Sequence, residues 1–324
     1  MKAMVATRWG EPSELEYVDV PDPEPGPGQV LVETRAMGCN FPDILMVQGK
    51  YQVKPPLPFS PGHEIAGVVR AVGAGVTGVR PGERVIANLE WGGYAERAVT
   101  AAERVYPIAD ALPFDQAAAF FVVYQTGYSA LVRRAALQPG EWLLVHGAAG
   151  GVGLAAVQLG KALGARVIAT AGTPEKLEMA RQSGADVLID YRTEDWVERV
   201  KAVTGGEGAD VIYDPVGGDV FDGSTKCLAF EGRLLTIGFA GGRIPTVAVN
   251  RLLLKNISVV GVHWGYYQRR GSPLVQEWMD ALLKLYDQGR IRPVIYRAYP
   301  LREAAAALRA LAARESYGKV VLVP

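Results

Sequence analysis

A glycine-rich segment in the middle of the chain has the residue types and spacing to hold a phosphate. Residues 145–153 read V-H-G-A-A-G-G-V-G, after an apolar run and before a stretch with apolar residues at helical spacing. Such a turn between a strand and a helix presents free backbone amides at the positive end of the helix dipole. The next apolar run, residues 165–170, predicts a second strand. Strand, glycine turn, helix and strand together indicate a dinucleotide-binding unit.

The fingerprint of this unit is G-x-G-x-x-G. Ala148 occupies the first glycine position, and Gly150 and Gly153 match the other two. Gly150 lets the backbone approach a pyrophosphate, and Gly153 lets the helix lie close to the strand. Similar turns also occur without ligands, but the surrounding elements favour a nucleotide. We therefore expect the turn to contact a cofactor through Ala149, Gly150, Gly151, Val152 and Gly153.

The second strand ends without an acidic residue. NAD sites usually place Asp or Glu there, bonded to the ribose 2′-hydroxyl. Here Thr170 and Ala171 are followed by Gly172, which we expect to contact the cofactor, and Lys176 lies a few residues further on. A 2′-phosphate needs a cation, so this composition favours NADPH. In the alternative interpretation Lys176 is a solvated lysine on the first turn of a helix, and the neighbouring Glu175 opposes a phosphate site.

The composition limits the possible partners. A length of 324 residues predicts two domains with ample core. Lys+Arg and Asp+Glu both number 34, so net charge gives no argument for nucleic acid or an anionic surface. No apolar run approaches the 18 residues or so of a membrane span. Two cysteines, Cys39 and Cys227, are too few for a disulfide framework, and we expect a cytoplasmic protein.

The elements fall into two patterns. Short apolar segments separated by proline and glycine clusters fill the first part of the chain, which is typical of an all-β barrel or sandwich. From Phe114 onward strands alternate with helices, which predicts a parallel, doubly wound sheet. We expect strands at 29–34, 65–73, 83–87, 187–191, 211–214, 233–238 and 258–262, and helices at 194–203 and 274–288.

The end of the chain departs from this alternation of strands and helices. Residues 318–323 predict a last strand, which we expect to rejoin the first domain. The predicted boundaries are 1–122 for the first domain, 123–265 for the nucleotide-binding domain and 266–324 for the return. Residues 250–260 are apolar and predict an edge strand, whose exposed backbone invites pairing.

Six short motifs, in this order along the chain, give it a family resemblance. The chain resembles the medium-chain dehydrogenases/reductases, and within them the zinc-independent NADPH:quinone oxidoreductases related to zeta-crystallin. The motifs are G-C-N-F-P-D at 38–43, P-G-H-E-I-A-G at 61–67, G-G-Y-A-E at 92–96, T-G-Y at 126–128, the segment 146–153, and V-I-Y-D-P-V-G-G at 211–218.

The resemblance implies an α/β plus β fold. A GroES-like barrel domain is split in sequence around a doubly wound Rossmann domain, and the active site lies in the cleft between them. NADPH is the implied cofactor, and the implied partner is a small electrophilic acceptor, without nucleic acid or membrane. Members of the family dimerise through the strand that corresponds to 250–260, so we expect a homodimer.

The zinc-containing alcohol dehydrogenases that resemble this chain place a His and a Glu at their metal, where His63 and Glu64 stand here. A catalytic zinc needs three protein ligands. Alignment through the motifs puts Asn40 and Val122 at the two cysteine positions, and neither can replace a thiolate. We therefore expect no metal, and we interpret His63 as a retained barrel residue.

The resemblance also assigns roles to side chains. Asn40 and Tyr51 line the substrate side, where Asn40 can donate to a carbonyl of the acceptor and Tyr51 can supply a proton; otherwise Tyr51 is a surface-packing aromatic. A second tyrosine of the quinone reductases falls at Leu45 here, which makes the cleft more apolar. On the cofactor side, the implied contacts are Thr126 near the nicotinamide, Lys176 and Tyr191 at the 2′-phosphate, and Phe239 and Val262 in loops after late strands. His146, beside the glycine turn, is interpreted as structural.

Four functions are compatible with these residues. The first is NADPH-dependent reduction of quinones, which are electrophilic enough to take hydride without a metal. The second is NADPH-dependent reduction of activated C=C bonds in enones or enoyl thioesters. The third is a non-catalytic, crystallin-like NADPH-binding protein. The fourth, a zinc alcohol dehydrogenase, conflicts with the ligand positions above.

Overall fold

The computed structural model describes residues 1–324, which divide into two compact units. Unit 1 contains residues 1–122 and 293–324, and unit 2 contains residues 123–292. The chain thus returns to unit 1 at Pro293, later than the predicted position 266. The helical segment between these two positions belongs to unit 2, and one of its contacts there is long-range in sequence: Gln125 Nε2 donates to the Val275 carbonyl at 2.9 Å. The alternation of strands and helices in the sequence does not predict this contact.

Unit 2 is built on a parallel sheet of six strands in the order β10-β9-β8-β11-β12-β13. The order reverses between β8 and β11, and ligands of doubly wound sheets bind at the carboxyl ends of the strands beside such a reversal. The predicted Rossmann architecture is confirmed. The strands are β8 (Trp142–Val145), β9 (Arg166–Ala171), β10 (Val187–Asp190), β11 (Ala209–Asp214), β12 (Leu228–Thr236) and β13 (Ser258–Gly261).

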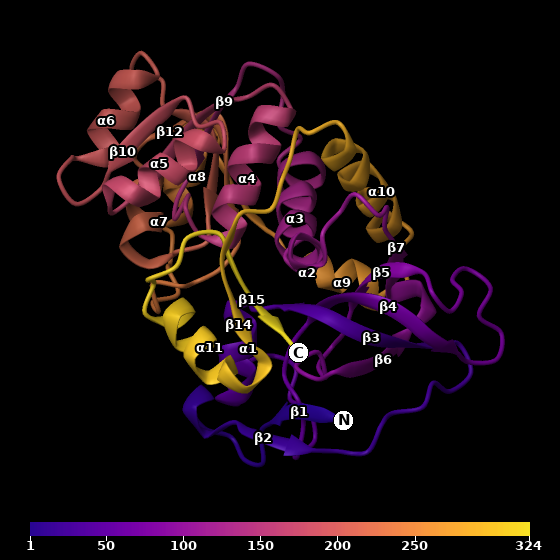
Figure 1. Ribbon diagram of the computed structural model, residues 1–324. Coiled ribbons are helices and arrows are strands. Elements are labelled where there is room, and N and C mark those ends of the chain that lie inside the picture. Colours follow the sequence, from indigo (N-terminus) through magenta and orange to yellow (C-terminus); the bar gives the residue numbers. More distant parts are fainter. The chain divides into compact units, whose positions relative to one another are not determined.

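Helices connect these strands (Figure 1). Their starts follow local capping chemistry: Thr173 caps α5, whose first residue is Pro174, and Asp195 caps α6 through the amides of Val197 and Glu198. The helices are α3 (Phe121–Tyr128), which continues into the π-helical segment η3 (Ser129–Arg134), α4 (Gly151–Ala162), α5 (Pro174–Gln182), α6 (Trp196–Val203), α7 (Gly218–Ser224), α8 (Val249–Lys255), α9 (Trp264–Arg269) and α10 (Leu274–Asp287).

One predicted strand of unit 2 is wrong over most of its length. Residues 249–255 form helix α8, and only β13 is a strand, at the edge of the sheet. The segment is rich in Leu, Arg and Lys, which favour a helix over a strand. Asn256 ends the helix in the left-handed conformation with φ of 52°. Apolar content alone therefore misled the sequence interpretation.

Unit 1 is a β domain whose main sheet has seven strands in the order β14-β15-β3-β4-β5-β7, with β6 paired to β3. Neighbouring strands are antiparallel except β14 and β15. Strands β1 and β2 form a separate antiparallel pair. The strands are β1 (Lys2–Val5), β2 (Glu16–Asp19), β3 (Gln29–Gly38), β4 (Glu64–Val72), β5 (Arg84–Asn88), β6 (Arg97–Ala101), β7 (Val105–Pro107), β14 (Ile295–Pro300) and β15 (Lys319–Val323).

Short helices complete unit 1. The core between sheet and helices includes Val32, Ile65 and Leu322, all without exposed surface. The helices are η1 (Pro12–Glu14), α1 (Phe41–Val47), η2 (Ala102–Arg104), α2 (Phe114–Ala118), η4 (Leu301–Glu303) and α11 (Ala304–Ala312). In the whole chain, no helix has the length and apolar character that crossing a membrane requires.

The last strand rejoins unit 1, as predicted. β15 pairs antiparallel with β3, with Leu322 opposite Met37, and this brings the C-terminal end of the chain beside the N-terminal sheet (Figure 1). The first residue of β15, Lys319, is 4% exposed. Its ammonium donates to the Cys39 carbonyl at 2.7 Å and to Glu64 Oε1 at 2.8 Å. A buried ion pair therefore ties β15 to β4.

Replacing Lys319 with Met should destabilise the protein by about 3–5 kcal/mol, because Glu64 would keep a buried charge without its cation. Urea unfolding measures the change. The matched control is Lys201→Met, which breaks a solvent-exposed ion pair with Glu198 and should cost less than about 1 kcal/mol. Equal effects of the two substitutions would contradict the role given to the Lys319 ammonium.

Candidate functional site

The glycine turn joins β8 to α4 in a conformation that requires glycine. Gly147 has φ of +56°, which favours glycine, and Gly150 is the N-cap of α4. A Cβ on Gly153 would lie 2.2 Å from the Gly147 carbonyl oxygen, so the first turn of α4 can approach the strand only with glycine there. The helix N-terminus thus faces the turn with free amides, as a phosphate site needs.

His146, next to this turn, is locked by two hydrogen bonds. Its Nε2 lies 2.9 Å from Ser224 Oγ, and its Nδ1 lies 3.0 Å from Thr170 Oγ1. Ser224 already donates its hydroxyl hydrogen to the Val220 carbonyl, so Nε2 carries the proton and Nδ1 accepts from Thr170. Burial lowers the pKa of His146 to about 3. A neutral, fully bonded imidazole therefore joins β8, β9 and α7.

The carboxyl ends of β9 and β10 place polar side chains around Gly172. The two strands pair in parallel, with Asp190 opposite Ala171. A Cβ on Gly172 would lie 2.6 Å from the Tyr191 hydroxyl and 3.0 Å from Arg192 Nε. The phenol and the guanidinium thus both stand over the glycine, at the strand end where a ribose binds in this fold.

Lys176 lies shortly after the carboxyl end of β9. It is the third residue of α5, and its backbone amide donates to Thr173 Oγ1 at 3.3 Å. Glu175 beside it is exposed. The structure thus brings Lys176, Tyr191 and Arg192 to adjoining strand ends. Sequence reasoning missed Arg192, although a cation directly after Tyr191 was a usable signal.

The other predicted cofactor residues lie on three elements of unit 2. Phe239, 40% exposed, follows β12, and its Cδ1 would be 3.0 Å from a Cβ on Gly217, after β11. Val262 follows β13 and donates its amide to the Thr236 carbonyl at 3.2 Å. Both lie at the carboxyl edge of the sheet. Thr126 is a partly buried residue of α3, whose carbonyl accepts from Ser129.

In unit 1, the carboxylate of Glu64 has no exposed surface and accepts three hydrogen bonds. Oε2 accepts from the backbone amide of Val122 at 2.8 Å. Oε1 accepts from Asn40 Nδ2 at 2.9 Å and from the Lys319 ammonium at 2.8 Å. These three donors engage both oxygens of the buried carboxylate.

Asn40, predicted to donate to an acceptor, is 5% exposed and engaged on every side. Its Oδ1 accepts from Lys319 at 2.7 Å, and its Nδ2 donates to Glu64 and, at 3.3 Å, to the Gly38 carbonyl. Both amide hydrogens are already used. In this structure Asn40 belongs to a buried network, because burial requires its polar atoms to be paired. Its role as a donor to the acceptor stays a prediction.

Beside this network, Asp43 holds His63. Asp43 Oδ1 lies 2.5 Å from His63 Nδ1. Asp43 Oδ2 accepts from the Asn40 amide and the Tyr94 hydroxyl, both at 2.8 Å. Burial raises the pKa of Tyr94 well above its usual value, so this phenol stays a donor.

Tyr51 packs on the core of unit 1 and against His63. The two ring centroids are 5.7 Å apart and the planes meet at 87°. The loop holding Tyr51 is anchored by its backbone amide, which donates to the Leu45 carbonyl at 3.1 Å. The structure thus brings Tyr51 together with His63 and Asp43, a combination that the sequence motifs did not reveal.

A metal centre does not fit these residues. The chain brings no three His, Cys, Asp or Glu side chains into an arrangement that could hold an ion. Asn40 and Val122 occupy the positions where thiolates were expected in the zinc enzymes, and the thiol of Cys39 is buried with its pKa raised to about 12 by that burial. The Glu64 carboxylate is paired with the Lys319 ammonium.

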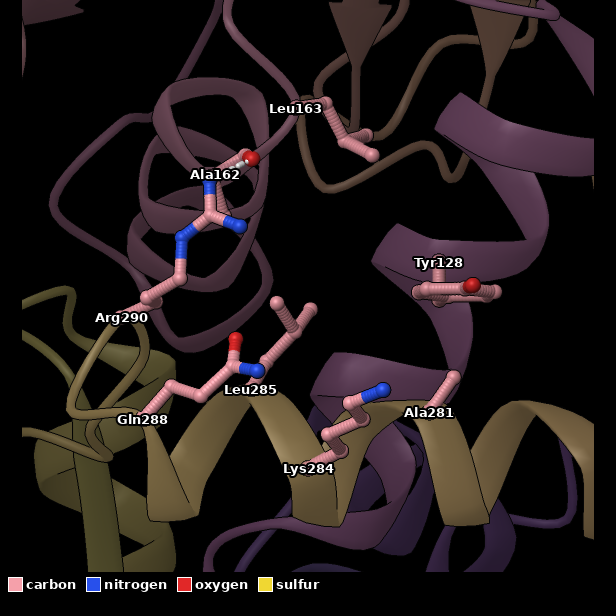
Figure 2. Close-up of a pocket in the computed structure, with 8 residues that line it drawn as sticks. All are labelled: Tyr128, Ala162, Leu163, Ala281, Lys284, Leu285, Gln288 and Arg290. Atoms are coloured by element: carbon pink, nitrogen blue, oxygen red, sulfur yellow. Dashed lines mark hydrogen bonds between the residues drawn. The ribbon is translucent and has the colours of Figure 1, made fainter.

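A separate hollow of about 320 Å³ lies in unit 2 (Figure 2). Tyr128 from α3, Lys284 and Leu285 from α10, and the carboxyl end of α4 line it. Arg290 crosses it and donates to the Ala162 carbonyl, as Figure 2 shows. The glycine turn begins at the opposite end of α4, roughly 18 Å away for a helix of twelve residues. The hollow is therefore not the nucleotide site.

Comparison with known proteins places this geometry in a family. A model described as alcohol dehydrogenase GroES-like domain matches residues 26–110, and one described as zinc-binding dehydrogenase matches residues 151–284. A quinone oxidoreductase-like protein 2 homolog of Nematostella vectensis is 42% identical over 300 residues, 92% of this chain and 82% of that protein. The chain belongs to the quinone oxidoreductase family of medium-chain dehydrogenases/reductases.

Two further members of the quinone oxidoreductase family cover the whole chain or nearly so. The quinone oxidoreductase of Pseudomonas aeruginosa is 41% identical over 318 residues, 98% of this chain and 97% of that protein. The solved structure of Escherichia coli quinone oxidoreductase complexed with NADPH aligns over all of both chains with a TM-score of 0.92 at 34% identity.

The environment of His146 predicts a pH dependence of stability. Its folded pKa of about 3 lies below the usual 6.5, so its contribution is complete above pH 6.5 and is lost as pH falls toward 3. Between pH 7 and pH 4 this loss should amount to about 3 kcal/mol. Urea unfolding of the wild type and of His146→Gln, measured across this range, should give curves that converge at low pH. Curves that stay parallel would contradict a buried neutral His146.

Proposed function

We propose that the protein is an NADPH-dependent, metal-independent reductase of quinones. The observation that carries this proposal is the cluster of Lys176, Tyr191 and Arg192 at the ends of β9 and β10, with no acid at the tip of β9. Two cations and a phenol suit a 2′-phosphate, whereas a ribose diol would call for a carboxylate. The relatives named quinone oxidoreductase support the acceptor class.

Each unit contributes one part of the proposed reaction. Reduced nicotinamide supplies hydride, and a quinone is electrophilic enough to accept it without a Lewis acid. The glycine turn and α4 bind the pyrophosphate, and the strand-end cluster binds the adenosine phosphate. In unit 1, Tyr51 lies beside buried polar groups and can bind or protonate the acceptor oxygen. Metal independence rests on the donor set, because Glu64 and Asn40 are held by Lys319.

Activated alkenes are the second proposed substrate class, and the Asp43–His63 pair beside Tyr51 favours them. Hydride addition to an enone or enoyl thioester leaves an α-carbon that needs a proton, whereas a reduced quinone can take protons from solvent. Steady-state rates with 1,4-benzoquinone and with crotonyl thioesters separate the two classes. Binding of NADPH without turnover of either would instead support a non-catalytic protein.

We also propose a homodimer formed through α8 and the edge strand β13. Val249, Leu253 and Leu254 are 75%, 75% and 79% exposed, an unusual concentration of apolar surface on one helix. A partner subunit that covers this surface would remove it from water. Leu253→Glu should shift sedimentation equilibrium toward the monomer, whereas Lys284→Glu on α10 should not; a wild-type monomer at micromolar concentration would overturn this proposal.

The strand-end cluster makes a kinetic prediction. Lys176→Ala and Arg192→Ala should each raise the KM for NADPH about 10- to 100-fold, because each removes one charge-assisted contact of about 1.5–3 kcal/mol. The KM for NADH should change little, since it has no 2′-phosphate. Lys284→Ala, a lysine of the hollow in Figure 2, is the control. Equal changes for both coenzymes would remove these residues from phosphate recognition, and a wild type that prefers NADH would overturn the proposed cofactor.

A further inference from the structure

We propose that helix α9, together with Arg134, binds the phosphates of an acyl thioester whose thiol belongs to a phosphorylated nucleotide carrier. The acceptor class is then the enoyl thioesters of such a carrier. The inference rests on the proposed hydride transfer and deepens it, because it names one class among the activated alkenes. All residues of the proposed phosphate site lie in unit 2.

The sequence around α9 contains no acidic residue. Residues 232–276 have no Asp or Glu, although the whole chain has 34 of them in 324 residues. Arg269 and Arg270, at the end of α9, are exposed and have no carboxylate within ion-pair distance. Glu277, the first acid after this stretch, is not paired with either of them. The two guanidiniums therefore keep an unneutralised positive charge, which attracts anions.

Tyr266 holds the two guanidiniums close to one another. Its ring is 52% exposed, and the Cζ atoms of Arg269 and Arg270 lie 5.8 and 5.7 Å from the ring centroid. Two cations held on one ring repel each other, so a bound phosphate would stabilise this arrangement. Guanidiniums match phosphate oxygens in geometry, and an exposed aromatic ring can stack on a nucleotide base. A phosphorylated nucleotide offers both groups.

The other tyrosine of α9 anchors the helix. Tyr267 packs against Trp278 of α10, which is buried, with ring centroids 5.2 Å apart. The Ser272 amide donates to the Tyr267 carbonyl at 3.0 Å and closes the end of the helix. Between the tyrosines and the arginines, Gln268 has a buried Nε2 without an acceptor. An unpaired buried donor calls for a partner, and a ligand oxygen would supply one.

Arg134 brings a third guanidinium to the same edge of the sheet. Its Nε donates to the carbonyl of Gly261 at 3.0 Å. Gly261 is the last residue of β13, and α9 begins three residues later. Arg134 is exposed and makes no ion pair, so its two terminal nitrogens are open to an anion.

The strand order separates this site from the predicted contacts of the 2′-phosphate. β13 is the edge strand, and four strand spacings divide it from β9. At about 4.8 Å for each spacing, the two strands are roughly 19 Å apart. Lys176, Tyr191 and Arg192 follow β9 and β10 near the opposite edge. The guanidiniums of α9 are therefore not needed for the adenosine phosphate of NADPH.

The length of α9 favours a long substrate. Val262, a predicted cofactor contact, directly follows β13, and a helix of six residues then spans about 9 Å before the arginines. A quinone ring carries no charge to place there. A thioester carrier instead has its phosphates at the end of a flexible arm, far from the carbon that is reduced.

The phosphate site takes no part in the chemical step. The β-carbon of the enoyl thioester receives hydride from reduced nicotinamide, and the α-carbon receives a proton from solvent. The products are NADP⁺ and the saturated thioester. Residues of α9 bind the carrier and hold the acyl group in place.

The test compares two substrates with the same enoyl group. Crotonyl-coenzyme A carries the phosphorylated nucleotide, and the crotonyl thioester of N-acetylcysteamine lacks it. In the wild type with saturating NADPH, kcat/KM should be about 10-fold or more higher for crotonyl-coenzyme A. Added salt should reduce this advantage, because it screens exposed charges. In the double variant Arg269→Ala/Arg270→Ala, the ratio of the two kcat/KM values should fall about 10-fold or more, as expected for lost charge-assisted contacts.

Two matched substitutions control this comparison. Arg309→Ala removes an exposed arginine of α11 that has no ion pair and should leave the ratio unchanged. Tyr266→Phe should keep the ratio, whereas Tyr266→Ala should lower it, because stacking requires the ring and not the hydroxyl.

Calorimetric titration with coenzyme A tests the phosphate site without turnover. The protein is saturated with NADPH, which keeps coenzyme A out of the cofactor site. The wild type should bind coenzyme A, and the double variant should bind it about 10-fold more weakly or less. Equal effects of the double substitution on both thioesters, or no binding of coenzyme A to the NADPH-loaded wild type, would overturn the inference. Turnover of 1,4-benzoquinone would then leave the proposed quinone reductase intact. A wild type that oxidises NADPH with no acceptor would overturn the proposed function, and the titration would still decide whether the phosphate site exists.

Discussion

The bonding of one buried carboxylate decides what chemistry unit 1 can support. Glu64 accepts from the Lys319 ammonium, the Asn40 amide and the Val122 backbone, and has no exposed surface. Removing the Lys319 ammonium would leave the buried Glu64 charge without a cation, which is far costlier than losing a surface ion pair. The same contacts tie the C-terminal strand β15 to β4 and hold Asn40, the N-cap residue of α1. The buried charge of Glu64 thus constrains both the strand arrangement of unit 1 and the position of Asn40.

This constraint separates the chain from the metal enzymes that it matches in part. The matched family models include one described as zinc-binding dehydrogenase, and the G-H-E motif is retained. Here, however, the His63 imidazole is held by Asp43 and the Glu64 carboxylate by Lys319. Residues at the positions of metal ligands in the zinc enzymes are here bonded to other side chains of this protein. Electrophilic acceptors are the substrates that we propose for this protein, because a nicotinamide alone can reduce them.

Much of the fold was predictable because local chemistry dictates it. The glycines at 147, 150 and 153 specify the β8–α4 turn through backbone conformation and close contact, and both can be inferred from the sequence. The elements that were missed depend on long-range packing. Helix α8 was mistaken for a strand because its apolar sequence resembles an edge strand. Helix α10 was assigned to the other unit because its contacts are distant in sequence. Lys319 and Glu64 are separated by 255 positions in the sequence, so no local sequence pattern predicts their ion pair.

The most direct measurement of the central claim is quinone turnover at known metal content. Purified protein is treated exhaustively with a chelator, its metal content is determined by mass spectrometry, and NADPH oxidation with 1,4-benzoquinone is then followed. The account predicts an unchanged rate with far less than one metal ion per chain, and no stimulation by added zinc. Loss of turnover on chelation, with recovery on addition of zinc, would contradict it.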